Sequence, residues 1–139
     1  MTPRAPSREE RCSRSDAVHR LAQADAYLVA ATLVVDDGTD SANPGVAASL
    51  AVLAGIAASD AACCARLGKR ARGQSHLEAV ALLKTVSPHG AAMAKDLERL
   101  VARKDAAHYA ATLLPPAEAT RMVTWATRLV QQAGAAVEA

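Results

Sequence analysis

The chain has 139 residues, a formal net charge of +2 and a composition that is 51% hydrophobic but only 2% aromatic, with no phenylalanine. This length fits one domain with one core, and it excludes a two-domain protein. A core without Phe must be built from Ala, Leu and Val, which indicates closely packed helices, and the small net charge does not by itself predict a nucleic-acid-binding protein.

Residues 1–14 are rich in Arg, Ser and Pro and show no periodicity. This pattern predicts a disordered basic tail, followed by a single helical-bundle domain at residues 15–139. The tail lacks the apolar segment of a signal peptide, so we expect a cytoplasmic protein. The three cysteines show no Cys-x-x-Cys spacing, which predicts reduced thiols without a disulfide framework or a zinc site, and Cys64 is expected to be a small core residue.

The first helix is predicted at residues 16–35, and it ends at the turn signature Asp36-Asp37-Gly38. Its expected core face carries Val18, Leu21, Ala22, Leu28 and Val29. Residues 26–35 are apolar nearly all round, so this segment needs cover on both sides. We therefore expect the bundle to cover one side and a second subunit to cover the other, as in a homodimer.

A second helix is predicted at residues 44–66, with Asn43 as its cap, Pro44 at its first position and Gly68 as its stop. Its expected core stripe consists of Val46, Leu50, Leu53, Ala57 and Cys64, and Asp60 lies within this stripe. Residues 41–59 carry no charge, but they are mostly small. This weak hydrophobicity indicates a buried helix and no membrane span.

A basic loop at residues 67–74 leads to Ser75-x-x-Glu78, a capping box that predicts a third helix at residues 75–86. The basic side chains in and beside this loop are Arg66, Lys69, Arg70 and Arg72. They are either solvated surface charges or contacts to RNA or another anion. The segment Ser87-Pro88-His89-Gly90 ends the third helix.

A fourth helix is predicted from Ala91 to a point before Leu114, because Pro115-Pro116 follows. A straight helix would direct Arg103 and His108 to different sides, so either the helix bends or breaks near Lys104, or each residue meets the copy from a partner subunit. Leu97, Leu100 and Val101 mark its inner face. Helical periodicity brings Lys104 and His108 to the same face, with Asp105 at its edge. The last helix, at residues 116–134, is expected to bury Met122, Trp125, Ala126, Leu129, Val130 and Ala133.

Five helices with short connections predict an all-α fold, an antiparallel bundle of four long helices plus one shorter helix. The spacing Arg103-x4-His108 late in such a bundle resembles the signature of the HEPN superfamily, and the resemblance covers about residues 15–134. It implies a homodimer that binds RNA or a nucleotide and acts as a metal-independent endoribonuclease of a toxin–antitoxin or defence system. An antitoxin protein is the partner that it implies.

By this resemblance Arg103 and His108 are the catalytic residues, and the copies from two subunits meet at the dimer interface. His108 would transfer protons as the RNA 2′-hydroxyl attacks phosphorus, and Arg103 would stabilise the phosphoryl oxygens. Lys104 stands where the family more often has Asn, His or Asp. The four histidines lack the spacing of a metal site, so no metal and no cofactor are expected.

Asp60 is expected to face Lys104 and His108 across the bundle, with Asp105 and Tyr109 completing a supporting polar network. A carboxylate beside His108 would prepare the imidazole for acid–base chemistry. An interior salt bridge that specifies helix register is an equal alternative, and Tyr109 could simply pack on a neighbouring helix. Two other functions stay open: a non-catalytic HEPN-like interaction module, and an unrelated Ala-rich bundle without a site.

Overall fold

The structure is a computed structural model, and it describes residues 8–37, 43–73, 76–104 and 114–139. These ranges contain five helices and two short strands. In chain order the elements are β1 (Glu9–Arg11), α1 (Arg14–Asp36), α2 (Pro44–Leu67), β2 (Lys69–Ala71), α3 (His76–Lys84), α4 (Gly90–Ala102) and α6 (Pro116–Glu138). The predicted all-α class is confirmed, apart from the small sheet.

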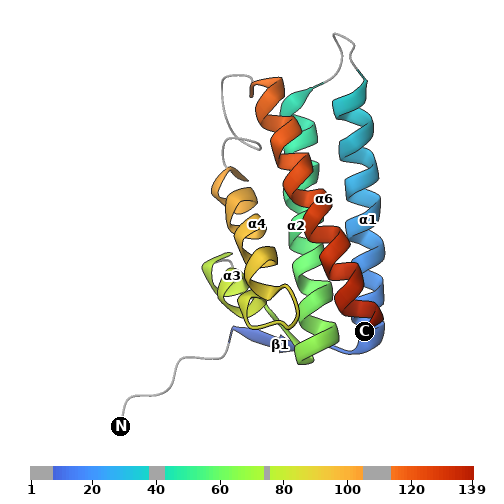
Figure 1. The fold of residues 1–139 in the computed structure, drawn as a ribbon, viewed down its shortest axis with the longest axis vertical. Coiled ribbons are helices and arrows are strands. Elements are labelled where there is room, and N and C mark those ends of the chain that lie inside the picture. The colour runs from blue at the N-terminus through green and yellow to red at the C-terminus, as the bar shows by residue number, and fades with distance from the viewer. Residues whose placement is uncertain (1–7, 38–42, 74–75, 105–113) are drawn as a thin grey trace.

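Three long helices, α1, α2 and α6, lie side by side, and the shorter α4 packs against α2 and α6 (Figure 1). α1 and α4 run in one direction, whereas α2 and α6 run in the other. The pair α2 and α6 lies between α1 and α4, because both α2 and α6 contact each of these outer helices. α3 packs against α4 near the end of the bundle that carries the sheet.

Local signals in the sequence define several helix ends. The Asn43 side chain accepts a hydrogen bond of 3.2 Å from the Val46 amide, and Pro44 opens α2. Gly68 ends α2 with φ +70°, a conformation that glycine adopts without steric cost. A capping box between Ser13 and Asp16 starts α1 at Arg14, slightly earlier than predicted.

Part of the segment predicted to be a disordered tail is ordered in the structure. β1 pairs with β2 in an antiparallel register that sets Glu10 opposite Arg70 and Glu9 opposite Ala71. The opposite charges of Glu10 and Arg70 favour this pairing, whereas Arg11 opposite Lys69 is a like-charge pair that opposes it. Lys69 instead pairs with Glu9 at 2.9 Å. The tail prediction therefore differs from the structure at residues 8–14, because residues far away in the sequence provide the partner strand.

The prediction of three free thiols is also wrong, because Cys12 and Cys64 form a disulfide with Cα atoms 5.3 Å apart. The Cys12 amide donates to the Gly68 carbonyl at 3.0 Å, which holds the end of β1 beside the last turn of α2. The two cysteines are 52 residues apart in the sequence, so their spacing does not indicate that they lie close together in the fold. Cys63 is the free and buried cysteine.

The core face of α1 also differs from the prediction. Ala17, Ala24 and Ala31 are fully buried at seven-residue intervals, whereas Val18 and Val29 are 53% and 61% exposed. A seven-residue repeat keeps one narrow stripe against neighbouring helices. The small alanine side chains let α1 approach α2 and α6 closely, so the larger residues Val18 and Val29 are left outside.

α2 repeats this arrangement. Val46 and Leu53 are 47% and 37% exposed, although both were expected in the core, and alanines fill the buried faces. α2 is the one helix in the described ranges whose length and composition would allow it to cross a membrane. The most apolar stretch of 18 residues in α2 is 67% buried inside the bundle, as expected for a core helix.

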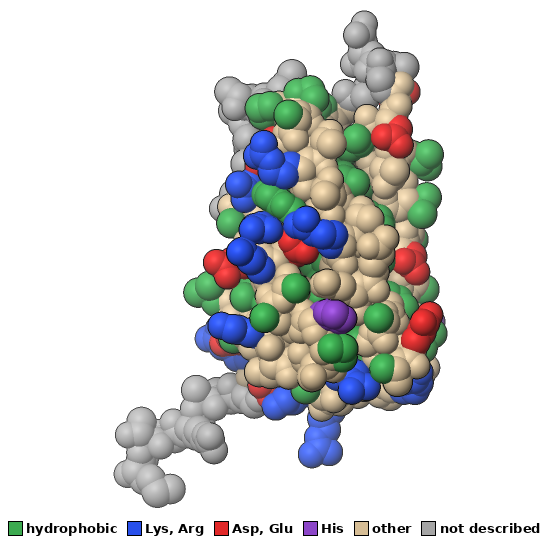
Figure 2. Space-filling view, in the orientation of Figure 1, with side chains coloured by type: hydrophobic (Ala, Val, Ile, Leu, Met, Phe, Trp, Pro, Cys, Tyr) green, Lys and Arg blue, Asp and Glu red, His purple; other side chains and the backbone are tan. Residues whose placement is uncertain are grey.

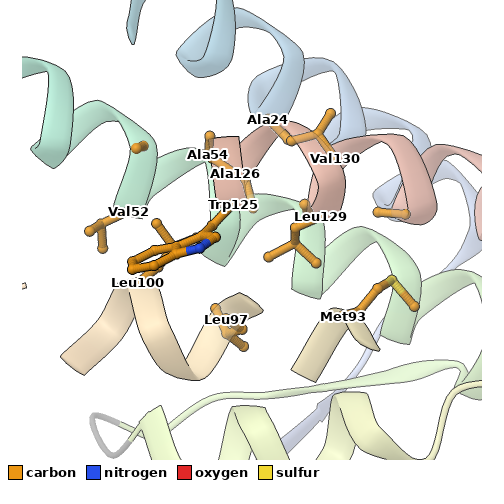
Figure 3. Packing of buried hydrophobic residues seen from close by; sticks show 14 of the residues in the cluster. Ala24, Val52, Ala54, Met93, Leu97, Leu100, Trp125, Ala126, Leu129 and Val130 are labelled. Carbon is orange, nitrogen blue, oxygen red and sulfur yellow. The ribbon is translucent and has the colours of Figure 1, made fainter. Parts of the chain in front are cut away.

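α4 and α6 contribute the large core residues. Leu97 and Leu100 of α4 meet Trp125 and Leu129 of α6, and Trp125 is 8% exposed (Figure 3). The predicted core face of α6 is confirmed. α4 comes close to α2 at Gly55, where a Cβ added to the glycine would lie 2.6 Å from Leu100 Cδ1.

Candidate functional site: an arginine face around Trp125

Arg103 of the predicted catalytic pair lies at the end of α4. The helix stops at Ala102, and Arg103 caps it with φ −105° and ψ 5°. The predicted fourth helix was expected to carry the motif, with a bend near Lys104 or a break between Arg103 and His108 left open, and in the structure α4 ends at Ala102. Asp105, His108 and Tyr109 fall outside the described residues.

The Arg103 side chain is held within its own chain. Its Nε donates to Glu118 Oε1, its Nη1 donates to the Arg99 carbonyl at 3.2 Å, and its guanidinium lies 4.7 Å from the Trp125 ring centre. The guanidinium of Arg99 lies 5.7 Å from the same ring. Two cations thus face one indole, and cation–π attraction favours both.

Two further arginines of α6 complete this surface. Arg121 Nη1 donates to Glu118 Oε2 at 2.8 Å, and Arg128 Nη2 donates to Asp96 Oδ1 at 2.9 Å. Figure 2 shows Lys and Arg side chains gathered over α4 and α6. We call this surface the Trp125 face; its arginines are Arg99, Arg103, Arg121 and Arg128, and its acids are Asp96 and Glu118.

The acids of the Trp125 face lie beneath the arginines. The side chains of Asp96 and Glu118 are 6% and 20% exposed, whereas the four arginines are 36–55% exposed. The hydrogen bonds to Asp96 raise the pKa of Arg128 further above its ordinary value. Four cations against two carboxylates leave the face net positive, and each of the four arginine side chains is partly exposed. Such a surface suits anions with several charges, because Arg binds phosphate through paired donors.

Lys104 does not pair with Asp60. Its ammonium lies 3.2 Å from Nε2 of His76, at the start of α3. Lysine only donates hydrogen bonds, so this contact requires Nε2 to accept, as it does in a neutral imidazole with its proton on Nδ1. Burial, and then the charge of Lys104, lower the pKa of His76 below 6.5. The expected position of Lys104 assumed that the fourth helix continues in phase, whereas α4 ends at Ala102.

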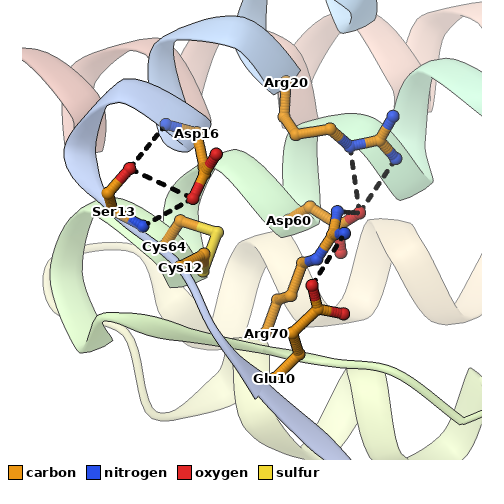
Figure 4. Close-up of a disulfide and its surroundings, with 8 residues drawn as sticks. All are labelled: Glu10, Cys12, Ser13, Asp16, Arg20, Asp60, Cys64 and Arg70. Atoms are coloured by element: carbon orange, nitrogen blue, oxygen red, sulfur yellow. Dashed lines mark hydrogen bonds and ion pairs between the residues drawn. A yellow bond between two sulfur atoms is a disulfide. The ribbon is translucent and has the colours of Figure 1, made fainter.

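Asp60 has other partners, which corrects the predicted pairing. Its Oδ2 accepts from Arg20 Nη2 at 2.8 Å and from Arg70 Nη1 at 3.2 Å (Figure 4). Arg70 also lies 3.6 Å from Glu10. Burial raises the pKa of Asp60, while the Arg20 and Arg70 charges act in the opposite direction. α1 and β2 supply these arginines at the end of α2, away from the Trp125 face.

The basic loop is largely engaged in this second network. Lys69 pairs with Glu9 at 2.9 Å, and Arg70 is shared by Asp60 and Glu10, whereas Arg66 and Arg72 are exposed. A cavity of about 200 Å³ beside the disulfide is lined by Glu10, Cys12, Asp16, His19, Arg20 and Arg70. Acids and bases are mixed there and mostly paired, so this cavity is less suited to anions than the Trp125 face.

The one free thiol of the described ranges is that of Cys63, which is buried. Burial, assisted by the charge of Asp60, raises the pKa of Cys63 to about 12, so this thiol is not ionised at neutral pH. Among the described residues, no group of three His, Cys, Asp or Glu side chains could hold a metal ion.

Reasoning from the sequence identified Arg103 but missed the rest of the Trp125 face. Arg99 and Arg103 are four residues apart on α4, and Arg121, Trp125 and Arg128 follow helical spacing on α6. Those spacings could have indicated two basic edges. A comparison with known protein families, curated proteins and solved structures finds no match to this chain.

Proposed function

We propose that this chain is a HEPN-like helical bundle that binds single-stranded RNA on the Trp125 face. The observation that carries the proposal is the set of four partly exposed guanidiniums, supported from below by Asp96 and Glu118. RNA presents closely spaced phosphates and planar bases. Arginines bind the phosphates, and exposed guanidinium planes offer stacking surfaces to unpaired bases.

The resemblance adds a catalytic step to this proposal. Arg103 belongs to the Trp125 face and also opens the motif Arg103-x4-His108. His108 follows Arg103 by five residues in the sequence, and in this proposal it takes a proton from a 2′-hydroxyl of the bound RNA, which then attacks the neighbouring phosphorus. The leaving 5′-oxygen then takes a proton, and the products are a 2′,3′-cyclic phosphate and a 5′-hydroxyl. An antitoxin that covers this face would suppress both binding and cleavage.

Binding is tested with a fluorescent single-stranded RNA, by anisotropy over a salt series. We expect the double variant Arg121→Ala/Arg128→Ala to bind more weakly and to show a salt slope smaller by about 0.7 for each lost phosphate contact. Each acid keeps one arginine, Arg103 or Arg99, so the fold should survive. The matched control is Arg66→Ala/Arg72→Ala at the basic loop; a larger loss in that control would move the RNA site to the loop.

Cleavage is tested with the same RNA in the presence of EDTA, by comparing wild type with His108→Ala and Arg103→Ala. An otherwise identical substrate with 2′-deoxy nucleotides should stay intact, because the attacking hydroxyl is missing. Circular dichroism must first show that each variant is folded. Equal cleavage by wild type and His108→Ala would contradict the catalytic step without affecting the binding proposal.

A second candidate is a non-catalytic interaction module, and one observation favours it. Arg103 already uses its guanidinium on Glu118 and Trp125 of its own chain, as a residue with a structural role does. This candidate predicts that RNA is not cut by wild type under any tested condition. It also predicts that Arg103→Ala lowers the free energy of unfolding through lost packing on Trp125.

A further inference from the structure

α1 carries a second apolar stripe on the side away from the core. Its members are Val18, Ala22, Ala26, Val29 and Leu33, all of them exposed. At about 100° per residue they fall within an arc of roughly 80°, centred about 160° away from the buried stripe of Ala17, Ala24 and Ala31. Val18, Val29 and Leu33 are 53%, 61% and 67% exposed. A continuous apolar stripe on a helix surface marks an interaction site more often than chance exposure does.

We propose that a second copy of this chain packs antiparallel on this outer stripe of α1. The stripe is symmetric about the point between Asp25 and Ala26, because Val18 and Leu33 are equally far from it, as are Ala22 and Val29. An antiparallel copy therefore sets Val18 against the partner's Leu33 and Ala22 against the partner's Val29. A two-fold axis requires a surface that is complementary to itself in this way.

The charges along α1 favour the same pairing. Arg14, Asp16 and His19 lie toward its N-terminal end, where the Asp16 carboxylate is bound to Ser13 in the capping box, and Asp36 and Asp37 lie at its C-terminal end. In an antiparallel pair each basic end meets an acidic end, whereas a parallel pair would bring like charges together. The small side chains Ala22 and Ala26 near the axis let the two helices approach closely. Asp25 lies at the edge of the stripe and next to the axis, so its charge is unfavourable for this packing.

The position of this interface has a consequence for the RNA site. α2 and α6 lie between α1 and α4, so an α1 dimer keeps each α4 on the side of its own chain away from the dimer interface (Figure 1). The two copies of Arg103 do not meet across this axis. The dimer would bind RNA at two separate faces, each within one chain. The interface itself does not depend on the proposed RNA binding, because it rests on α1 alone.

The oligomeric state tests the proposal, measured by analytical ultracentrifugation of the full chain. We expect wild type to sediment with twice the 14.4 kDa mass of one chain, and Val29→Glu/Leu33→Glu to be monomeric with an unchanged helical signal. The matched control is Leu77→Glu, which alters a 77% exposed leucine on α3 and should leave the dimer intact. A wild type that stays monomeric at about 100 µM, or a dimer that survives the double variant, overturns the proposal.

Cross-linking tests the antiparallel register. Ala26→Cys lies next to the axis and should form an intermolecular disulfide under mild oxidation. Val18→Cys should not, because its copy lies about 22 Å away along the helix, at 1.5 Å per residue. The reverse result would indicate a parallel pair and overturn the proposed register. The RNA-binding assay, repeated on the monomeric double variant, separates the two proposals, because each single face should keep its intrinsic affinity.

Discussion

Lys104 follows Arg103 directly, and its contact with His76 joins the end of α4 to the start of α3. A neutral imidazole accepts a hydrogen bond from the ammonium at 3.2 Å, whereas a protonated one would repel it. The contact therefore depends on pH, and it lies next to the segment that carries the motif. The two residues are 28 positions apart, and the sequence offers no sign that they are partners.

The sign of the pH effect follows from the lowered pKa of His76. The unfolded chain binds a proton near pH 6.5, while the folded chain resists it, so this stabilising contribution is full above 6.5 and is lost as the pH falls through the lowered folded pKa. NMR titration of the His76 ring measures the folded value. Lys104→Met should raise this pKa, and Lys95→Met, an exposed lysine of α4, should leave it unchanged. An unaltered pKa in Lys104→Met would rule out the contact.

The connection between α3 and α4 depends on one glycine. A Cβ at Gly90 would lie 2.7 Å from the Lys84 carbonyl oxygen and 2.8 Å from that of Leu83. These are backbone atoms of the preceding helix, so they cannot rotate away as a side chain would. The close approach sets the angle at which α4 leaves α3, and with it the position of Arg99 and Arg103 over Trp125.

Gly90→Ala is expected to lower the free energy of unfolding by about 1–3 kcal/mol, because the added methyl group forces the two helices apart. Gly134→Ala in α6 is the matched control. A Cβ at Gly134 meets nothing within 4 Å of the described residues, and alanine should stabilise the helix there by about 0.5–1 kcal/mol. Urea unfolding of both variants gives the two values, and equal effects would contradict the steric account.

The bundle as a whole is tied at one end by the disulfide between Cys12 and Cys64. It closes a loop that contains α1 and most of α2 and fixes the small sheet beside the last turn of α2. The Trp125 face lies on other helices. Reduction should therefore change the stability of the molecule more than the proposed affinity for RNA.

Reduction is expected to lower the free energy of unfolding by about 2–4 kcal/mol, because the cross-link restricts the unfolded chain. Denaturant unfolding with and without a thiol reductant measures the difference. The double variant Cys12→Ala/Cys64→Ala should resemble the reduced protein and respond to reductant no further. Identical unfolding of oxidised and reduced wild type would mean that the bond does not form in solution.

The sequence by itself determined the features that depend on neighbouring residues: the helical class, the start of α2 at Asn43-Pro44, its stop at Gly68 and the core face of α6. Only the tertiary structure decided which faces of α1 and α2 are buried, because alanine stripes and Val/Leu stripes both satisfy helical periodicity and the closer packing of alanines selects between them. It also decided the partners of Asp60, the Cys12–Cys64 bond and the Trp125 face. Each of these features joins residues that are far apart in the chain. The packing of the helices fixes the distances between such residues, and spacing along the sequence does not predict that packing.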